Sequence, residues 1–531
     1  MNARPGFLPP APRAPWAAGR ALLRRLGVAC AALAAAACTT LPEAPLPPPD
    51  AECQAWAQQL DAAVAQAGVA DAEAERIAGV AGLRVDRVGE ALRDRARADD
   101  AAYRAWLQRA AALDEAGRAA EIANLPAARF PLRAGAAAVA VAVADREVDR
   151  EAARALTDRC RQRTLQQLAS APGPTREALL ARAQVPDRYS LGLRALGLYP
   201  LVRWPFFAGV QRWQAGHEAA MARWAVQPPP LQRHVPATAD AAAPPPWPPA
   251  TDALGLPQPT PEQARQLLAW HAPVLEIEQR GPYDRFGTPA WGDDGRPRVD
   301  DARPVVWQRI AHMPLAGQWR LQLVYLLWFP ERPPRSSFDL LAGALDGVMV
   351  RLTLGADGRP LLVDTAHACG CYHQFFPSAA LRLRPGAPRH QEWLFAPATM
   401  PALPDTHRLV VRIASASHDV LGLQALPRDE AAGTGTVYAL QPDQALRSLP
   451  AAGGRRSLYG PDGLVSGTER GERHLFWPMG IDSAGAMRQW GHHATAFVGR
   501  RHFDDAMLLE ERFEWVGAGA DSPAPPAARG R

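Results

Sequence analysis

The chain has no lysine among its 531 residues, and no apolar run in it is long enough to cross a bilayer as a mature helix. Schiff-base catalysis and a P-loop both require a lysine amine, so both are excluded. The GxSxG motif of the α/β-hydrolase nucleophile elbow is also absent. Arginine and alanine abound instead, and the length exceeds what one hydrophobic core usually organises, which predicts two folded domains.

The first 37 residues have the parts of an export signal. Three arginines between residues 20 and 25 precede the short apolar run Leu26 to Ala37. The end of this run and the next residue, Ala35-Ala36-Ala37-Cys38, resemble the lipobox of bacterial lipoproteins, although that family usually has leucine where Ala35 stands. The resemblance implies that residues 1–37 are a signal peptide and that Cys38 becomes the lipidated amino terminus. An ordinary cleaved signal or a signal anchor is the alternative.

The residues after Cys38 indicate where the anchored chain resides. Lipoproteins retained in the inner membrane tend to have aspartate directly after the lipidated cysteine, and this chain has Thr39. The resemblance therefore implies an anchor on the periplasmic face of the outer membrane. Residues 38–50 are rich in proline, which predicts an extended, semi-rigid tether.

The charge of the mature chain argues against a nucleic-acid partner. Five arginines and no acidic residue precede Cys38, so cleavage there lowers the formal net charge from +5 to zero. A neutral protein has no large electrostatic attraction for a phosphate backbone. The membrane, reached through the lipid anchor, is the only partner that the sequence suggests.

The mature chain changes character along its length. Residues 51–226 are rich in Ala, Leu, Arg, Glu and Gln with few breakers, which predicts a helical domain. Residues 227–260 contain PPP twice and read as a linker. Residues 261–516 contain short alternating segments that predict a β domain, and 517–531 are expected to be a disordered tail. The predicted fold class is α+β, with an N-terminal helical domain followed by a mainly antiparallel β domain.

Particular strands can be assigned within the β domain. Gln318 to Phe329 begins with apolar side chains at every second position and then becomes wholly apolar, as a buried strand does. Gly347 to Leu354 and Arg359 to Thr365 flank a turn and predict a β-hairpin. Short strands are also expected at Ala494 to Val498 and at Met507 to Trp515.

An aromatic segment closes the helical domain. Leu196 to Trp213 (LGLYPLVRWPFFAGVQRW) gathers five aromatic residues around Pro200 and Pro205. Such a segment can enter a membrane interface, but packing between two helices is the interpretation we favour.

A cysteine and histidine cluster is the main candidate for chemistry. His367, Cys369, Cys371 and His373 alternate with other residues, so a regular strand would hold neighbouring ligands about 6.6 Å apart, too far for one ion. A bend at Gly370 would bring them together. They would then suit zinc or Cu(I), with His492 and His493 as candidates to complete the shell.

Oxidation offers a different account of the cysteines. An oxidising periplasm favours disulfides, and Cys53 with Cys160 would link two helices of the helical domain. Cys369 and Cys371 would then form a strained disulfide, hold a metal, or remain unpaired or redox-active thiols. The sequence leaves these three states open.

The remaining histidine motifs favour ordinary roles. His217-Glu218-Ala219-Ala220-Met221 lacks the second histidine of the HExxH metalloprotease motif, which predicts a surface histidine. His418-Asp419 after Ser417 supplies triad residue types in sequence only, and a surface loop is expected. The histidines in His474 to Met479 and Gln489 to His493 stand beside aromatics, as in a ligand pocket or in simple packing.

Three functions remain after these exclusions. We expect a lipid-anchored periplasmic protein with a binding role, in which the Cys/His cluster holds a metal ion. The first alternative is a metal- or thiol-dependent periplasmic enzyme that uses the same residues. The second is an envelope scaffold whose cysteines only form disulfides. The substrate and the protein partners are not indicated by the sequence.

Overall fold

The computed structural model describes residues 46, 50–129, 132–133, 147–237, 243–386, 390–431 and 435–517. The predicted signal peptide, Cys38, most of the tether and residues 518–531 lie outside these ranges. Residues Pro47–Arg531 form one compact unit. Within the described ranges, no helix combines the length and the apolar character needed to cross a membrane.

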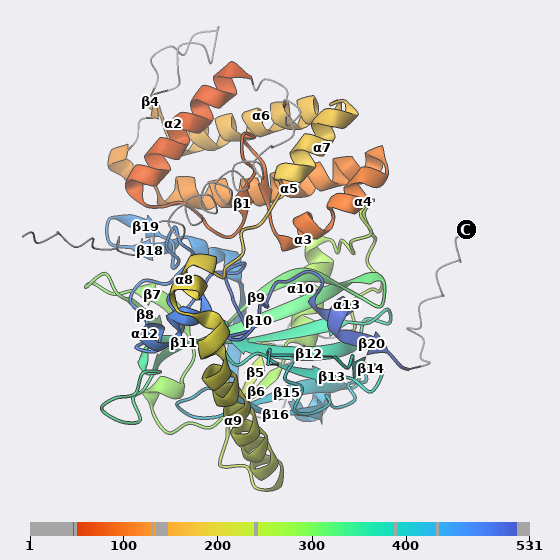
Figure 1. Cartoon of the computed structure of the whole chain (residues 1–531), viewed down its shortest axis with the longest axis vertical. Helices are drawn as coiled ribbons and strands as arrows, with labels where there is room; N and C mark the ends of the chain where they lie inside the picture. The colour runs from red at the N-terminus through yellow and green to blue at the C-terminus, as the bar shows by residue number, and fades with distance from the viewer. Residues whose placement is uncertain are drawn as a thin grey trace, which may run out of the picture. The chain divides into compact units, whose positions relative to one another are not determined.

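The amino-terminal part of the described chain is mainly helical (Figure 1). Its elements are α2 (Ala51–Ala67), β1 (Glu75–Arg76), β2 (Arg84–Val85), α3 (Arg87–Ala91), α4 (Arg93–Ala98), α5 (Asp100–Asn124), η1 (Ala127–Arg129), β3 (Leu132–Arg133), β4 (Glu147–Val148), α6 (Arg150–Ala169), α7 (Gly173–Arg182), α8 (Leu191–Leu196) and α9 (Tyr199–Val226). Aspartates begin α2, α5 and α6: the side chains of Asp50, Asp99 and Asp149 accept hydrogen bonds from the backbone three residues on. The predicted helical character is confirmed here.

A disulfide joins two of these helices. Cys53 of α2 and Cys160 of α6 are bonded, with a Cα to Cα distance of 5.3 Å. Beside the bond, Trp56 Nε1 donates to Thr157 Oγ1 at 3.1 Å inside an apolar cluster. The predicted pairing of these two cysteines is confirmed.

The carboxyl-terminal part is built on a ten-stranded curled sheet in the order β13-β12-β11-β10-β9-β17-β5-β6-β15-β16. The strands are β5 (Gln232–Pro236), β6 (Val274–Ile277), β9 (Val305–Leu315), β10 (Gln318–Arg332), β11 (Gly343–Leu354), β12 (Pro360–His367), β13 (Gln374–Pro377), β15 (His407–Ile413), β16 (Val420–Pro427) and β17 (Thr436–Pro442). The sheet is mixed, because β6 pairs with β15, and β17 with both β5 and β9, in parallel.

The longest strand separates two apolar cores. Along β10, Leu323, Tyr325 and Leu327 face one core, while Leu326 and Trp328 face the other. This is the two-residue period of a strand buried on both faces. The predictions of this strand and of the β11–β12 hairpin are confirmed.

Smaller elements surround the sheet. They are α10 (Pro261–His271), η2 (Pro282–Asp284), β7 (Thr288–Trp291), β8 (Pro297–Asp300), β14 (Leu381–Leu383), α11 (Arg428–Ala431), η3 (Asp443–Arg447), β18 (Leu449–Ala451), β19 (Gly454–Arg456), α12 (Arg473–Phe476), η4 (Trp477–Met479), α13 (Leu508–Arg512) and β20 (Phe513–Trp515). One predicted strand is wrong and another is only partly correct. Residues 494–498 form only an isolated bridge, from Ala494 to His502. Of residues 507–515, α13 occupies 508–512, and only 513–515 form a strand, β20.

Two features connect the helical part to the sheet. Strand β5 lies inside the proline-rich range 227–260. Ion pairs also cross between the parts: Arg447 binds Asp71 at 2.6 Å, and Arg309 binds Glu73 at 2.6 Å. Both acids belong to the loop after α2, so this loop is held against the elements around β9.

Candidate functional site

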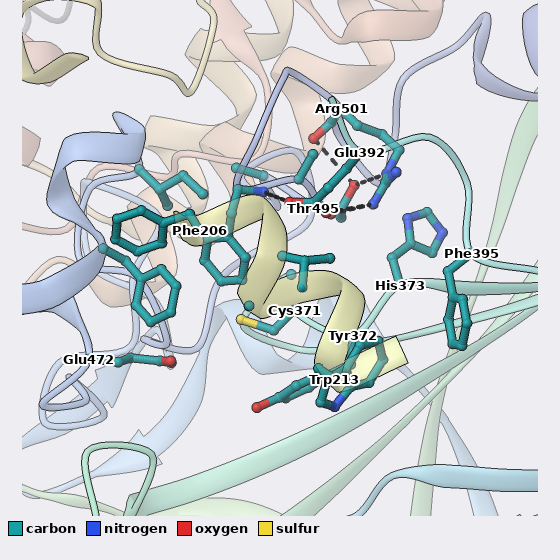
Figure 2. A pocket seen from close by; sticks show the side chains of 18 of the residues that line it. Phe206, Trp213, Cys371, Tyr372, His373, Glu392, Phe395, Glu472, Thr495 and Arg501 are labelled. Carbon is teal, nitrogen blue, oxygen red and sulfur yellow. Dashed lines mark hydrogen bonds and ion pairs between the residues drawn. The ribbon is translucent and has the colours of Figure 1, made fainter. Parts of the chain in front are cut away.

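A cavity of about 520 Å³ lies between α9 and the loops at one end of the sheet. Phe206, Val210 and Trp213 of α9 line it, together with apolar side chains such as Phe395 and Phe476. Figure 2 labels Phe206, Trp213 and Phe395 among these. The polar residues of its lining include Cys371, Tyr372, Glu392, Glu472 and Arg501. A mostly apolar cavity with a few polar groups is typical of small-molecule sites.

The Cys/His segment supplies one wall of this cavity because the chain turns between β12 and β13. Gly370 has a φ of +91°, and a Cβ there would lie 2.6 Å from the carbonyl oxygen of Ala494. Only glycine fits such a position. The backbone N–H of His367 donates to the oxygen of Cys371 at 3.0 Å and closes the turn. The bend predicted at Gly370 is confirmed.

The turn sends the predicted metal ligands in different directions. His367 binds Asp346, His373 binds Asp364, and both cysteines join the apolar core that contains Trp328. His492 binds the carbonyl oxygen of Ala72, and the ring of His493 lies beside that of Phe503, with 6.1 Å between the ring centroids. Among the described residues, no group of three or more histidine, cysteine or acidic side chains is placed to hold a metal ion.

Cys369 and Cys371 are unpaired, buried thiols. The backbone N–H of Cys371 donates to Cys369 Sγ at 3.4 Å. A hydrogen bond between the two thiol side chains, together with burial, raises the pKa of the Cys371 thiol well above its ordinary value. A protonated, buried thiol is a poor nucleophile and a poor metal ligand.

His373 belongs to a buried charge-balanced triad. Its Nε2–H donates to Asp364 Oδ2 at 2.9 Å, and Arg351 donates to both oxygens of the same carboxylate, at 3.0 and 2.7 Å. Burial lowers the pKa of His373 to about 4. The ring is therefore neutral near pH 7, and its Nδ1 is a hydrogen-bond acceptor. No partner for this atom is found among the described residues, and the side chain is fully buried, so this acceptor does not open onto the cavity.

Behind Tyr372 lies a second polar cluster. His418 Nδ1 donates to Asp346 Oδ2 at 2.9 Å, and His367 Nδ1 lies 3.5 Å from Asp346 Oδ1. Burial opposes charge on His418, but hydrogen bonds to Asp284 and Asp346 raise its pKa above the ordinary value. Burial likewise opposes charge on Asp346, yet the two histidines hold its pKa well below the usual range.

The backbone around this cluster is strained. Leu345, Tyr372, Ala416 and His418 all have φ between +50° and +64°, a region that residues other than glycine rarely adopt. Such conformations persist only where surrounding contacts enforce them, and they concentrate at functional sites. Tyr372 connects the cluster to the cavity, because its ring lies 4.8 Å from that of His367 and 5.0 Å from that of Trp213.

Glu472 is the most perturbed acid of the cavity wall. Its residue is 6% exposed. Burial raises the pKa of Glu472 to about 7, although the charges of Arg332 and Arg470 act to lower it. Glu392 accepts hydrogen bonds from the backbone of Phe497 and Val498, at 2.8 Å each, and burial raises its pKa as well. The raised pKa values favour the neutral form of both carboxyls, which suits an apolar surrounding.

Two histidines that the sequence placed on the surface are buried. His217 is 4% exposed, and its Nε2 lies 2.9 Å from Gln374 Oε1. His418 is fully buried, stacked on Phe329 at 3.9 Å. Both predictions are wrong, because contacts from distant strands bury these side chains. Of the histidine and aromatic motifs, Leu475 and Phe476 line the cavity while His474 is exposed.

Sequence reasoning missed several residues of the site. Asp346, Asp364 and Glu472 carry no local motif, and Trp213 was noted only as part of an aromatic segment. Only Cys371 and His373, of the predicted ligands, line the cavity. No protein-family model, curated protein or solved structure matches the chain.

Proposed function

We propose that this chain is a lipid-anchored protein of the periplasmic face of the outer membrane that binds an apolar small molecule in the cavity beneath α9. Its ligand has a largely apolar body. The proposal also keeps an N-terminal helical domain, residues 51–226, followed by a β domain, residues 261–516.

One observation carries the binding proposal: a cavity of about 520 Å³ whose walls are mostly apolar. The apolar walls favour a ligand that loses its own hydration on entry. The few polar side chains among them, such as Tyr372 and Glu472, would fix its orientation.

The binding test uses N-phenyl-1-naphthylamine, an apolar fluorescent probe with one N–H donor. Val210 lines the cavity on α9, and Ala215 is exposed on the same helix. Val210→Trp fills the cavity and should weaken probe binding at least about tenfold, or roughly 1.4 kcal/mol, whereas Ala215→Trp should leave it unchanged. Equal affinity in both variants and in the unmodified chain would rule out this cavity as the site.

The anchor rests on the sequence alone, through the lipobox-like residues that end at Cys38. Cys38→Ser should move the protein from the membrane fraction of cells to the soluble or unprocessed fraction, and mass spectrometry of the amino-terminal peptide should lose its acyl groups. An unacylated, cleaved amino terminus in the unmodified protein would refute lipidation.

A further inference from the structure

An exposed apolar surface extends over α8 and the start of α9. Its large side chains are Leu191, Leu196, Leu198, Leu201 and Trp204, which are 66%, 78%, 59%, 68% and 46% exposed. All five lie within fourteen consecutive residues. We call these residues the α8–α9 surface. Contiguous exposed apolar patches mark sites of interaction with a protein or a membrane.

Helix geometry places part of this surface on one face. Leu201, Trp204 and Ala208 are spaced by three and four residues along α9, so they lie on the same side of the helix, and all three are exposed. On the other side of the same turns, Phe206 and Gly209 line the cavity. One helix segment therefore separates the cavity from this exposed apolar face.

The segment is fixed to the rest of the protein. Arg194 Nε donates to the carbonyl oxygen of Met479 at 2.8 Å, and its guanidinium stacks between the rings of Tyr189 and Tyr199, at 4.6 and 4.4 Å. The side chain of Ser190 caps α8. These contacts fix the position of α8 and of the apolar side chains that it exposes.

The charged residues of this segment have one sign. Residues 188–217 contain four arginines and no acidic residue. Arg188 is paired with Glu75 at 2.5 Å and Arg194 is buried, which leaves Arg203 and Arg212 for a partner. Arg212 is exposed, and no partner for Arg203 Nε is found among the described residues. Asp187, at the border, is bound to Arg500 at 2.8 Å. Apolar side chains with aromatic residues and flanking arginines are typical of surfaces that enter the headgroup region of anionic bilayers.

We infer that the α8–α9 surface docks onto a bilayer of anionic phospholipid. The apolar side chains enter between headgroups, and Arg203 and Arg212 bind phosphates. A proline-rich tether of the proposed length, thirteen residues from Cys38 to Asp50, reaches at most about 40 Å, which keeps the body close to the leaflet that holds the anchor. This docking does not depend on which ligand occupies the cavity.

The test uses Pro47–Arg531, which contains every described helix and strand in one compact unit and has no lipid anchor. Flotation is measured with vesicles of phosphatidylethanolamine and phosphatidylglycerol and with vesicles of phosphatidylcholine alone. The body should float with the anionic vesicles and much less with the neutral ones, and added salt should weaken the binding.

Matched variants identify the surface. Leu201→Glu and Trp204→Glu should each weaken vesicle binding about tenfold or more, while Phe338→Glu, at a side chain 91% exposed elsewhere, should not. Circular dichroism melting confirms that each variant folds, and probe binding in the cavity should be unchanged, which separates this inference from the binding proposal. Failure of the unmodified body to float, or an equal loss in Phe338→Glu, overturns it. The inference is also overturned if light scattering shows a dimer that Leu201→Glu dissociates, because the surface is then covered by a second copy of the chain.

Discussion

Replacing Glu472 with glutamine should change the pH dependence of stability in a defined way. Burial raises the pKa of this carboxyl from an ordinary value near 4.5 to about 7. Between these two pH values the folded chain holds a proton that the unfolded chain has released. The free energy of unfolding therefore falls as pH rises through this range, and the shift of about 2.5 units corresponds to roughly 3 kcal/mol above pH 7.

Glutamine cannot ionise, so the Glu472→Gln variant should not lose this free energy of unfolding as the pH rises. Urea denaturation from pH 4.5 to 8.5 should give equal stability for the two proteins at the acid end and a variant more stable by about 3 kcal/mol at the alkaline end. Glu469→Gln, at an exposed carboxylate in the same loop, should follow the unmodified chain throughout. A constant offset of Glu472→Gln at all pH values would show that Glu472 ionises equally in both states and would refute the reasoning.

Three further outcomes can be measured on the same body. Replacing Cys53 and Cys160 together with alanine should lower the free energy of unfolding by about 2–5 kcal/mol, as seen in urea titrations, because the bond closes a loop with a sequence separation of 107. Asp364→Asn leaves the buried Arg351 without its anionic partner and should cost about 3–5 kcal/mol by thermal and urea melts; a loss under about 1 kcal/mol would mean that water reaches the pair. Buried neutral histidines should destabilise the fold in acid, because their pKa values lie below the unfolded value near 6.5. The free energy of unfolding should keep its full value above pH 6.5 and decline as pH falls toward 4. A free energy of unfolding that does not change over this range would contradict their burial. They are His234, His373 and His492, with pKa values of about 4, and His493, at about 3.

Local patterns were sufficient where a residue's surroundings come from its own element. The alternation along β10 reveals a strand because the sheet buries both of its faces. The bend at Gly370 follows from the one residue type that tolerates a positive φ. The Cys53 and Cys160 pair could be inferred because both lie in helical sequence.

Distant contacts decided the rest. His217 is buried because Gln374, 157 residues later, binds its ring. His418 has a raised pKa although it is buried, because Asp284 and Asp346 lie beside it, and nothing near His418 in the sequence predicts those carboxylates. Residues 494–498 have the alternation of a strand, but among the described residues no strand pairs with them. The cavity is lined by α9 and by loops more than 150 residues away in the sequence, so no single motif could predict it.

The position of β17 has a consequence for the order in which the protein assembles. This strand lies between β9 and β5, which precede it by more than one hundred residues. A chain made from its amino terminus can form the hairpins of β9 to β12 early, but it cannot join them to β5 and β6 until residues 436–442 arrive. Until then β5 and β9 each present an open edge, which is prone to pair with other chains. Newly made molecules are thus most in need of protection from aggregation just before the last hundred residues are complete.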